Sequence, residues 1–436
     1  MAKEASSHED DIKREFNFTT HSIISQVLRG VLVGIFAGLV VGVFRFLIEK
    51  IFHLVQDIYH RSQQSMLWLL ALVFLYAFIV FLNAHLVKSE KNIKGSGIPQ
   101  VEAELKGLMS LSWWSVLWKK FVLGILAIAS GLMLGREGPS IQLGAMSGKG
   151  VSKFLNLSAA EERALIASGA AAGLAAAFNA PIAGLLFVVE EVYRHFSRFF
   201  WVSTLAASLV ANFVSLSMFG LTPVLDMPDN IPVMRLEQYW IYLVMGLLLG
   251  LSAYLYEKVI LNIQLVYQFL GRIFGMSEAY YPILAFALIL PIGYFLTHLL
   301  GGGNQLILSL TAEHYTVGTL LLFFALRFVW SMLSYGSGLP GGIFLPILAL
   351  GSLLGGAMGA VCLQLGLISQ EQFPIFIILG MSGYFGAISK APLTAMILVT
   401  EMVGDISNLM PLGMVTLTAY IIMDLLKGAP VYEAML

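Results

Sequence analysis

The chain has 436 residues, of which 58% are hydrophobic and only 12% are charged. Soluble domains are nearer half apolar and a quarter charged, so this composition argues against a soluble protein and indicates a lipid bilayer as the main solvent. The net charge of −1 provides no basic surface for nucleic acid. The single cysteine, Cys362, excludes an intramolecular disulfide.

The first 21 residues are polar and charged, and they contain no apolar core followed by a small-residue cleavage site. They are therefore not a secretory signal peptide, and we expect a short cytoplasmic tail at 1–21. Charge-free stretches then recur along the chain, several of them close to the 20 or so apolar residues that a membrane helix requires. They cover residues 30–44, 66–84, 121–135, 164–189, 199–225, 238–256, 281–297, 328–370, 372–389 and 406–423.

Two of these stretches contain residues that break helices. Asn179 and Pro181 interrupt 164–189, and several Gly and Pro residues interrupt 328–370 between positions 336 and 346. A break at membrane depth frees backbone N–H and C=O groups, which lipid tolerates only where the backbone is buried in protein or lines a wet cavity. The sequence therefore predicts an all-α integral membrane protein with broken or re-entrant helices around a polar interior.

An internal repeat divides the chain in two. The segment Ala-Pro-Ile-Ala-Gly-Leu-Leu-Phe-Val-Val-Glu at 180–190 recurs as Ala-Pro-Leu-Thr-Ala-Met-Ile-Leu-Val-Thr-Glu at 391–401, and Gly-Arg-Glu-Gly at 135–138 has a weaker echo in Gly-Leu-Pro-Gly at 338–341. Repeated halves with interrupted helices are typical of secondary transporters, whose binding site lies where the halves meet. After the tail, we expect a first membrane repeat at 22–225, a linker at 226–237 and a second membrane repeat at 238–436.

The repeat separates two adjacent carboxylates. Glu190 has a counterpart in Glu401, which favours a structural role that both share, whereas Glu191 lies opposite Met402. An ionisable residue at membrane depth is a functional candidate, and an interfacial position is the alternative for Glu191. Our hypothesis is that the repeat supplies the scaffold and that departures from it supply the chemistry.

Three glycine-rich segments precede or begin apolar stretches: Gly-Ser-Gly-Ile-Pro at 95–99, Gly-Arg-Glu-Gly-Pro at 135–139, and Gly-Ser-Gly-Leu-Pro-Gly-Gly-Ile-Phe-Leu-Pro at 336–346. Proline suits the first turn of a helix, where unpaired N–H groups and the positive dipole end are found. Such ends, meeting inside the membrane, would replace the water shell of an anion without trapping it on a full positive charge. One segment alone would indicate a helix-packing contact. Three of them, two with a hydroxyl or carboxylate, favour an anion site.

The segments at 95–99, 135–139 and 341–346 resemble the signature motifs of the CLC family of chloride channels and chloride/proton antiporters. The resemblance also includes Lys120, the Ala-Ala-Ala-Phe-Asn-Ala-Pro…Glu-Glu segment at 175–191 and Ala-Pro-Val-Tyr at 429–432, and it covers about residues 25–435. It implies a CLC-type inverted repeat of many tilted and partly broken transmembrane helices. It further implies a multi-pass homodimer of the cell (inner or plasma) membrane, with one pathway for chloride and protons per subunit and no cofactor or metal.

The resemblance implies four chloride-binding residues. Ser96 and Tyr432 match residues whose hydroxyls contact the anion, and Ile343 and Phe344 match positions whose backbone amides line the same site. Hydroxyls are neutral donors, which suits a desolvated halide that must leave again.

The resemblance also implies two proton-transfer carboxylates, an external gate at Glu137 and an internal site at Glu191. A helix N-terminus would hold ionised Glu137 as it holds an anion, so the carboxylate would block the chloride position until it is protonated. An ion pair with Arg136 is the structural alternative, which the diverging directions of adjacent helical side chains disfavour. In the weaker echo of the repeat, Glu137 lies opposite Pro340.

Two cations border apolar stretches. We expect Lys390 to extend towards the membrane interface. Lys120 has two open interpretations, an interfacial cation or one that biases the pathway towards anions.

These patterns predict a secondary active transporter that exchanges chloride for protons. A passive, voltage- or proton-gated chloride channel on the same scaffold is the alternative, and Glu191 favours exchange because the family's channels usually lack an acid there. Ser96 favours chloride over fluoride or nitrate, since relatives that prefer those anions depart from serine at this position. An intramembrane enzyme is disfavoured, because no His and acid have hydrolase or metalloprotease spacing and no phosphate loop occurs.

Overall fold

The computed structural model describes residues 20–192, 198–228, 231–232, 234–313 and 315–436. Within these ranges the chain is helical, and its one β-type pairing is an antiparallel bridge between Gly135 and Gly342. Eight of the described helices are long and apolar enough to cross a membrane. The predicted all-α integral membrane class is therefore confirmed. The expected tail at 1–21 lies almost entirely outside the described residues, as do positions 229, 230 and 233 of the expected linker.

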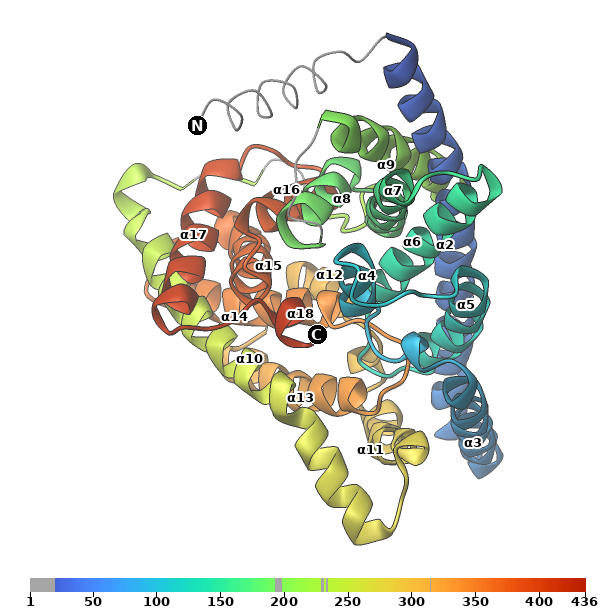
Figure 1. Cartoon of the computed structure of the whole chain (residues 1–436). Coiled ribbons are helices and arrows are strands. Elements are labelled where there is room, and N and C mark those ends of the chain that lie inside the picture. Colours follow the sequence, from blue (N-terminus) through green and yellow to red (C-terminus); the bar gives the residue numbers. More distant parts are fainter. Residues whose placement is uncertain (1–19, 193–197, 229–230, 233, 314) are drawn as a thin grey trace.

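The described residues of the first half form eight α-helices, which Figure 1 colours from blue to green. Its last short helix continues as a π-helical turn, η2 (Val188–Val192), before α9. The eight helices are α2 (Thr20–Ser62), α3 (Met66–Ser89), α4 (Ile98–Leu105), α5 (Trp113–Ala129), α6 (Glu137–Phe154), α7 (Ala159–Phe178), α8 (Pro181–Phe187) and α9 (Arg198–Phe219).

The second half repeats this order of long, short and broken helices. A short terminal helix, α18 (Val431–Ala434), is added, and it lies near the middle of the molecule in Figure 1, in contact with α4, α10 and α15. The repeated helices are α10 (Trp240–Phe274), α11 (Pro282–Phe295), α12 (Asn304–Ala312), α13 (Val317–Gly336), α14 (Phe344–Gln364), α15 (Phe373–Ser389), α16 (Pro392–Val403) and α17 (Leu409–Leu425).

The helix breaks predicted at Asn179 and Pro181 are present, and they occur in both halves. Asn179 ends α7 in the left-handed conformation with φ 55°, and α8 begins at Pro181. Lys390 ends α15 in the same conformation with φ 54°, and α16 begins at Pro392. Proline lacks the N–H that a first-turn residue does not need, so each Pro starts a new helix in a new direction. The predicted break between 336 and 346 is confirmed by the end of α13 at Gly336 and the start of α14 at Phe344.

Glycine allows the core helices of each half to pack in backbone contact. A Cβ on Gly144 of α6 would collide with the carbonyl oxygen of Gly169 on α7. In the second half, a Cβ on Gly351 of α14 would collide with the carbonyl oxygen of Gly380 on α15. The same close approach in both halves is what small residues at membrane helix contacts provide.

The two halves contact each other through a reciprocal pair of carboxylates. Glu190 accepts hydrogen bonds from the backbone N–H groups of Leu393 (3.2 Å) and Thr394 (2.7 Å) at the start of α16. Glu401 accepts them from Ile182 (3.1 Å) and Ala183 (2.8 Å) at the start of α8. Each half thus caps the helix of the other, which is the pattern of a two-fold relation.

This pair confirms the sequence prediction that Glu190 and Glu401 share a structural role. Carboxylates stabilise a helix start by accepting its orphan N–H groups and by opposing its dipole. Both carboxylates are thereby engaged in joining the halves, which leaves Glu191 as the acid of this segment that the repeat does not explain.

Candidate functional site

Three helix starts meet where the two halves join. The backbone N–H of Gly341 donates to the carbonyl of Gly95 (3.0 Å), and Gly135 and Gly342 exchange two N–H···O=C bonds of 2.7 Å each. These bonds connect the loops that lead into α4, α6 and α14. The helices begin at Ile98, Glu137 and Phe344. Each start presents N–H groups that have no acceptor within its own helix, so the three together form an environment for negative charge.

The structure corrects the weaker echo of the repeat. The sequence paired Glu137 with Pro340, but Gly135 bridges Gly342, and each of these glycines is followed by a helix start two residues later. Glu137 therefore occupies the position that Phe344 occupies in the other half. The pairing at 338–341 was wrong because its Gly residues belong to the loop before α14 and not to the helix start.

Ser96 lies in the loop before α4 and is 1% exposed. It packs directly on Gly138 of α6, where a Cβ would collide with the Ser96 hydroxyl and come within 2.8 Å of its carbonyl oxygen. The glycine at 138 is thus required for the serine loop to reach the start of α6. The Ser96 Oγ makes no hydrogen bond to any described residue.

Glu137 is the first residue of α6 and has no exposed surface. Its carboxylate folds back over Gly135, beside the backbone nitrogen of Leu345. Neither carboxylate oxygen makes a hydrogen bond of good geometry to a described residue. The alternative ion pair with Arg136 is not formed, because the Arg136 guanidinium lies 2.5 Å from Glu49 on α2.

Tyr432 on α18 is fully buried, and its hydroxyl makes no hydrogen bond to any described residue. Its ring meets the edge of Phe187 at a centroid distance of 6.2 Å, and Phe187 in turn meets Phe344 at 6.1 Å. The phenol of Tyr432 and the start of α14 therefore border one aromatic wall. The carboxylates of Glu137 and Glu191 are among the charges that act on this phenol.

Ile343 and Phe344, whose backbone amides the resemblance placed at the chloride site, lie at the start of α14. Ile343 is the N-cap residue and Phe344 the first helical residue, and both are buried. The Phe344 ring packs on Phe385 at a centroid distance of 4.1 Å, which turns the side chain into the core. The backbone N–H groups of this turn are the part left to face a ligand.

Glu191 lies in η2, is 1% exposed and is engaged with neighbouring residues. The corresponding part of the second half, α16, remains α-helical to Val403. A π-helical turn rotates successive side chains away from their α-helical directions, and such turns are frequent at functional sites. It allows Glu190 to reach across to α16 while Glu191 remains buried.

Sequence reasoning missed the structural role of two buried cations. The Lys120 Nζ donates to the carbonyl oxygens of Ile93 (3.0 Å) and Gly95 (2.7 Å) and thereby holds the Ser96 loop. In the second half, Arg327 is also fully buried and donates to the carbonyls of Leu299 (2.8 Å), Gly301 (3.0 Å) and Gly302 (2.7 Å). The two cations are different residue types, and their carbonyl partners are distant in sequence. No sequence motif therefore predicts that Lys120 and Arg327 play equivalent roles.

Lys390, expected to extend to the interface, forms an ion pair with Asp424 of α17 at 2.7 Å. Asp424 is 61% exposed, so the pair itself is open to the surroundings. Lys390 is also the left-handed residue between α15 and α16, and it therefore stabilises the break rather than the pathway.

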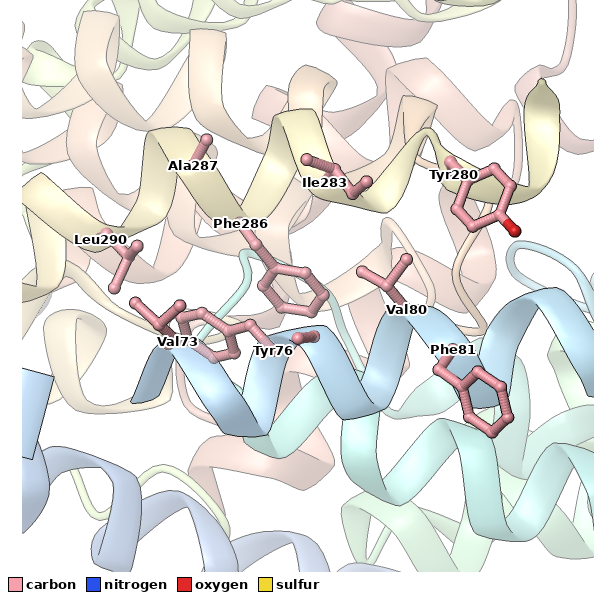
Figure 2. Close-up of a pocket in the computed structure, with 10 residues that line it drawn as sticks. Val73, Tyr76, Val80, Phe81, Tyr280, Ile283, Phe286, Ala287 and Leu290 are labelled. Carbon is pink, nitrogen blue, oxygen red and sulfur yellow. The ribbon is translucent and has the colours of Figure 1, made fainter. Parts of the chain in front are cut away.

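A cavity of about 370 Å³ reaches the Ser96 loop from one side of the molecule, lined by Lys94, Gly95, Ser96, Tyr335 and Gly338 among others. An apolar groove of about 440 Å³ lies elsewhere, between α3 and α11. Figure 2 shows its lining of Val73, Tyr76, Val80, Ile283 and Phe286, with almost no polar group among them. This groove lacks the donors that an anion requires, so it is not the site. No group of three or more His, Cys, Asp or Glu residues that could hold a metal occurs in the described part of the chain.

Comparisons with known proteins agree with this geometry. Residues 77–424 match the family model described as voltage gated chloride channel. The H(+)/Cl(-) exchange transporter ClcA of Vibrio parahaemolyticus serotype O3:K6 (strain RIMD 2210633) is 36% identical over 391 residues, which cover 85% of this chain and 80% of that protein. The ClcA protein of Salmonella arizonae (strain ATCC BAA-731 / CDC346-86 / RSK2980) is also 36% identical, over 381 residues, 85% of this chain and 79% of that protein.

The solved structures show the same fold. A slow cyanobacterial Cl-/H+ antiporter superimposes with a TM-score of 0.87 at 28% identity, over 93% of this chain and 96% of that one. A CLC-type fluoride/proton antiporter superimposes with a TM-score of 0.78 at 21% identity, over 96% and 99% of the two chains. The reciprocal caps and the repeated helix order are thus the inverted repeat of these transporters, and the chain belongs to the voltage-gated chloride channel (CLC) family.

Proposed function

We propose that this protein exchanges chloride for protons across the cell membrane through the site at the starts of α4, α6 and α14. The hydroxyls of Ser96 and Tyr432 and the backbone amides of Ile343 and Phe344 hold the anion. Glu137 is the external gate and proton carrier, and Glu191 is the internal proton donor and acceptor. The relatives named as H(+)/Cl(-) exchange transporters and the solved Cl-/H+ antiporter support exchange as the activity.

One observation carries the residue assignments. The Ser96 hydroxyl, both Glu137 carboxylate oxygens and the Tyr432 hydroxyl are buried polar atoms without a hydrogen-bond partner among the described residues. A buried polar group without a partner costs about 1–3 kcal/mol, and native proteins keep such groups mainly where a ligand, ion or water uses them. Here they gather around helix N-termini, where the ligand that fits is an anion.

The arrangement can move two ions because both use the same place. Ionised Glu137 is attracted by the start of its own helix and by the nearby backbone nitrogen of Leu345. Chloride at the same N-termini repels that carboxylate and favours its protonation. Protonated Glu137 loses the attraction and leaves the anion in place. One binding event therefore drives a proton onto Glu137, and the release of that proton returns the carboxylate to displace the anion.

Exchange also requires protons to reach Glu137 from the other side, and we assign that step to Glu191. Glu191 lies in the π-helical turn that directly follows Phe187, whose ring contacts Tyr432, so an acid stands near the anion site without being assigned as one of the anion's ligands. A passive chloride channel on the same scaffold would need no acid there. The family resemblance further suggests a homodimer in which each subunit has its own pathway.

The test uses the full chain in liposomes under a chloride gradient, with a potassium ionophore to clamp the membrane voltage and electrodes for chloride and pH. We expect the chloride gradient to drive protons against their own gradient. Chloride flux without proton movement would leave the channel as the function, and the absence of both fluxes would refute transport by this site.

A further inference from the structure

A second glycine loop duplicates the Ser96 loop in the other half. Gly301-Gly302-Gly303-Asn304 corresponds to Gly95-Ser96-Gly97-Ile98, and each loop runs directly into a helix, α12 or α4. The first and third glycines of both loops have positive φ, 59° and 94° at Gly95 and Gly97 and 74° and 122° at Gly301 and Gly303. Only glycine adopts such values freely, so the two loops share one backbone shape.

Both loops are fixed by a buried cation, and the same carbonyls are used. Lys120 binds the carbonyl of Gly95, and Arg327 binds the carbonyl of Gly301 and, in addition, that of Gly302. Carbonyls that bind the cation are not available to repel an anion. The N–H groups of the first turn of α12, which have no acceptor inside the helix, are the polar groups that this loop offers to a ligand.

The Gly301 loop borders a cavity of its own, of about 310 Å³, which we call the Gly301 cavity. Its lining includes Gly301–Asn304, Arg136, Glu49, His53 and Leu345. In an inverted repeat, equivalent loops face opposite sides of the membrane. The Gly301 cavity therefore opens on the side opposite to the cavity that reaches Ser96.

Arg136 provides an independent sign of a ligand in this cavity. The residue is 8% exposed, and its Nε makes no hydrogen bond to any described residue. The other edge of the guanidinium is paired with Glu49, which is itself paired with Arg45 at 3.2 Å. Among the lining residues, Arg136 balances the carboxylate of Glu49. Two further cations lie behind the lining, Arg45 on Glu49 and the buried Arg327 on the loop carbonyls, so the net fixed charge near the cavity favours an anion.

The cavity is adjacent to the gate. The side chain of Leu345 lines it, and the backbone nitrogen of Leu345 lies beside the Glu137 carboxylate. Gly302 stands where Ser96 stands in the other loop, so this position lacks a hydroxyl donor. An anion would therefore bind less tightly here than at Ser96, which suits an entry site that must release its ion into the pathway.

We propose that the Gly301 cavity binds a small monovalent anion, chloride in the transport cycle, between the first-turn amides of α12 and the guanidinium of Arg136, which lines the cavity. This site loads the pathway from the side opposite to Ser96. The proposal rests on the proposed function for its role in transport, but the binding site itself does not depend on Glu137 or Glu191.

The probe is bromide, located by anomalous diffraction in crystals of the full chain. We expect one peak between Ser96 and Tyr432 and another at Arg136 and Asn304. A peak at the first position alone overturns this inference and leaves the proposed function intact. The absence of both peaks overturns the proposed anion site together with the Gly301 site.

Variants then connect the site to transport. Asn304→Asp is nearly isosteric and suits a helix start, yet it places a carboxylate in the cavity. Arg136→Gln removes the cationic donor. We expect each variant to lose the bromide peak at the cavity and to raise the half-saturating chloride concentration on that side about tenfold. Arg136→Gln acts by loss of one charge-assisted hydrogen bond, and Asn304→Asp acts by repulsion between its carboxylate and the anion.

Lys50→Gln is the matched control, because it removes a cation from α2 beside Glu49 without changing the lining of the cavity. It should leave both the bromide peak and the half-saturating concentration unchanged. An equal effect of Lys50→Gln would show that only the general surface potential acts. Loss of the bromide peak at the cavity in Asn304→Asp without any change in the half-saturating chloride concentration would overturn the loading role.

Discussion

The two halves of this protein share a backbone and differ in the side chains that it presents. Helix starts, left-handed breaks, glycine contacts and buried cations recur in both, down to the carbonyls that Lys120 and Arg327 bind. The differences fall at the site, where Glu137 corresponds to Phe344 and Ser96 to Gly302. The comparison teaches that the repeated backbone supports the fold and supplies amide donors, whereas the carboxylate and hydroxyl side chains of the proposed site stand at positions where the first half departs from the second.

A third difference separates α8 from α16. Both helices end in a carboxylate that caps the opposite helix, Glu190 in one and Glu401 in the other. In the first half the chain reaches this carboxylate through a π-helical turn, and the next residue is Glu191 instead of Met402. The helix cap is thus present in both halves, whereas the additional acid, Glu191, is present only in the first.

The largest expected effect comes from removing the charge of Glu137, the residue that corresponds to Phe344 in the second half. Glu137→Gln should abolish proton transport and preserve chloride flux, because a neutral amide neither carries a proton nor competes with the anion as a carboxylate does. The measurement is paired chloride and pH recording from liposomes. Chloride-driven proton movement that persists in this variant would remove Glu137 from the mechanism.

The second prediction compares the adjacent carboxylates. Glu191→Gln should lose proton movement and retain chloride flux. Glu190→Gln should keep the coupling of the two ions and instead lower the free energy of unfolding by about 0.5–2 kcal/mol, the usual effect of losing a helix cap. The assignment of the two residues is wrong if Glu190→Gln alone uncouples transport.

The third prediction concerns the shared scaffold. Gly144→Ala and Gly351→Ala each place a methyl group against a carbonyl oxygen of the neighbouring helix, and forced packing of this kind typically costs about 1–3 kcal/mol. Thermal unfolding in detergent should show a similar loss for both variants. Gly318→Ala is the matched control, since it lies in helix α13 and its added Cβ would stand at an ordinary contact distance of 3.9 Å from the Thr316 Oγ1. A loss confined to one half would mean that the halves do not share the packing role.

The smallest expected effect comes from making the Ser96 loop resemble its counterpart. Ser96→Gly removes one neutral hydroxyl donor, which is worth about 0.5–1.5 kcal/mol, so chloride affinity should fall about two- to tenfold. Isothermal titration of the purified protein with chloride measures this change. Unchanged affinity would show that the backbone amides hold the anion without the serine.

Much of this architecture could be predicted from local sequence. Pro181 and Pro392, with the identical spacing to Glu190 and Glu401, identified the repeat and the shared structural role of the two carboxylates. The three glycine-rich segments identified helix starts, because Gly and Pro have specific backbone requirements there. The structure brings these segments together at the predicted interface of the halves.

Other features could not be predicted, because they depend on distant backbone atoms. A chance similarity of the glycines at 338–341 obscured which residue of the second half corresponds to Glu137. Pro139 and Pro346 follow the bridged glycines at equal distances, and this spacing gives the correct alignment of the two segments. The cations that hold the two glycine loops contact backbone carbonyl groups. Every residue has such a group, so no residue type in the sequence predicts these contacts. The same holds for the pairing of Lys390 with Asp424.

The bridge between Gly135 and Gly342 allows the two halves to carry different side chains at equivalent positions. The bridge consists of main-chain atoms alone, so it persists whatever side chains stand beside it. Next to this bridge one half carries a carboxylate, Glu137, and the other an aromatic ring, Phe344, while the main chains remain joined. Because the bridge is built from main-chain atoms, the side chains beside it can differ between the two halves and serve different functions.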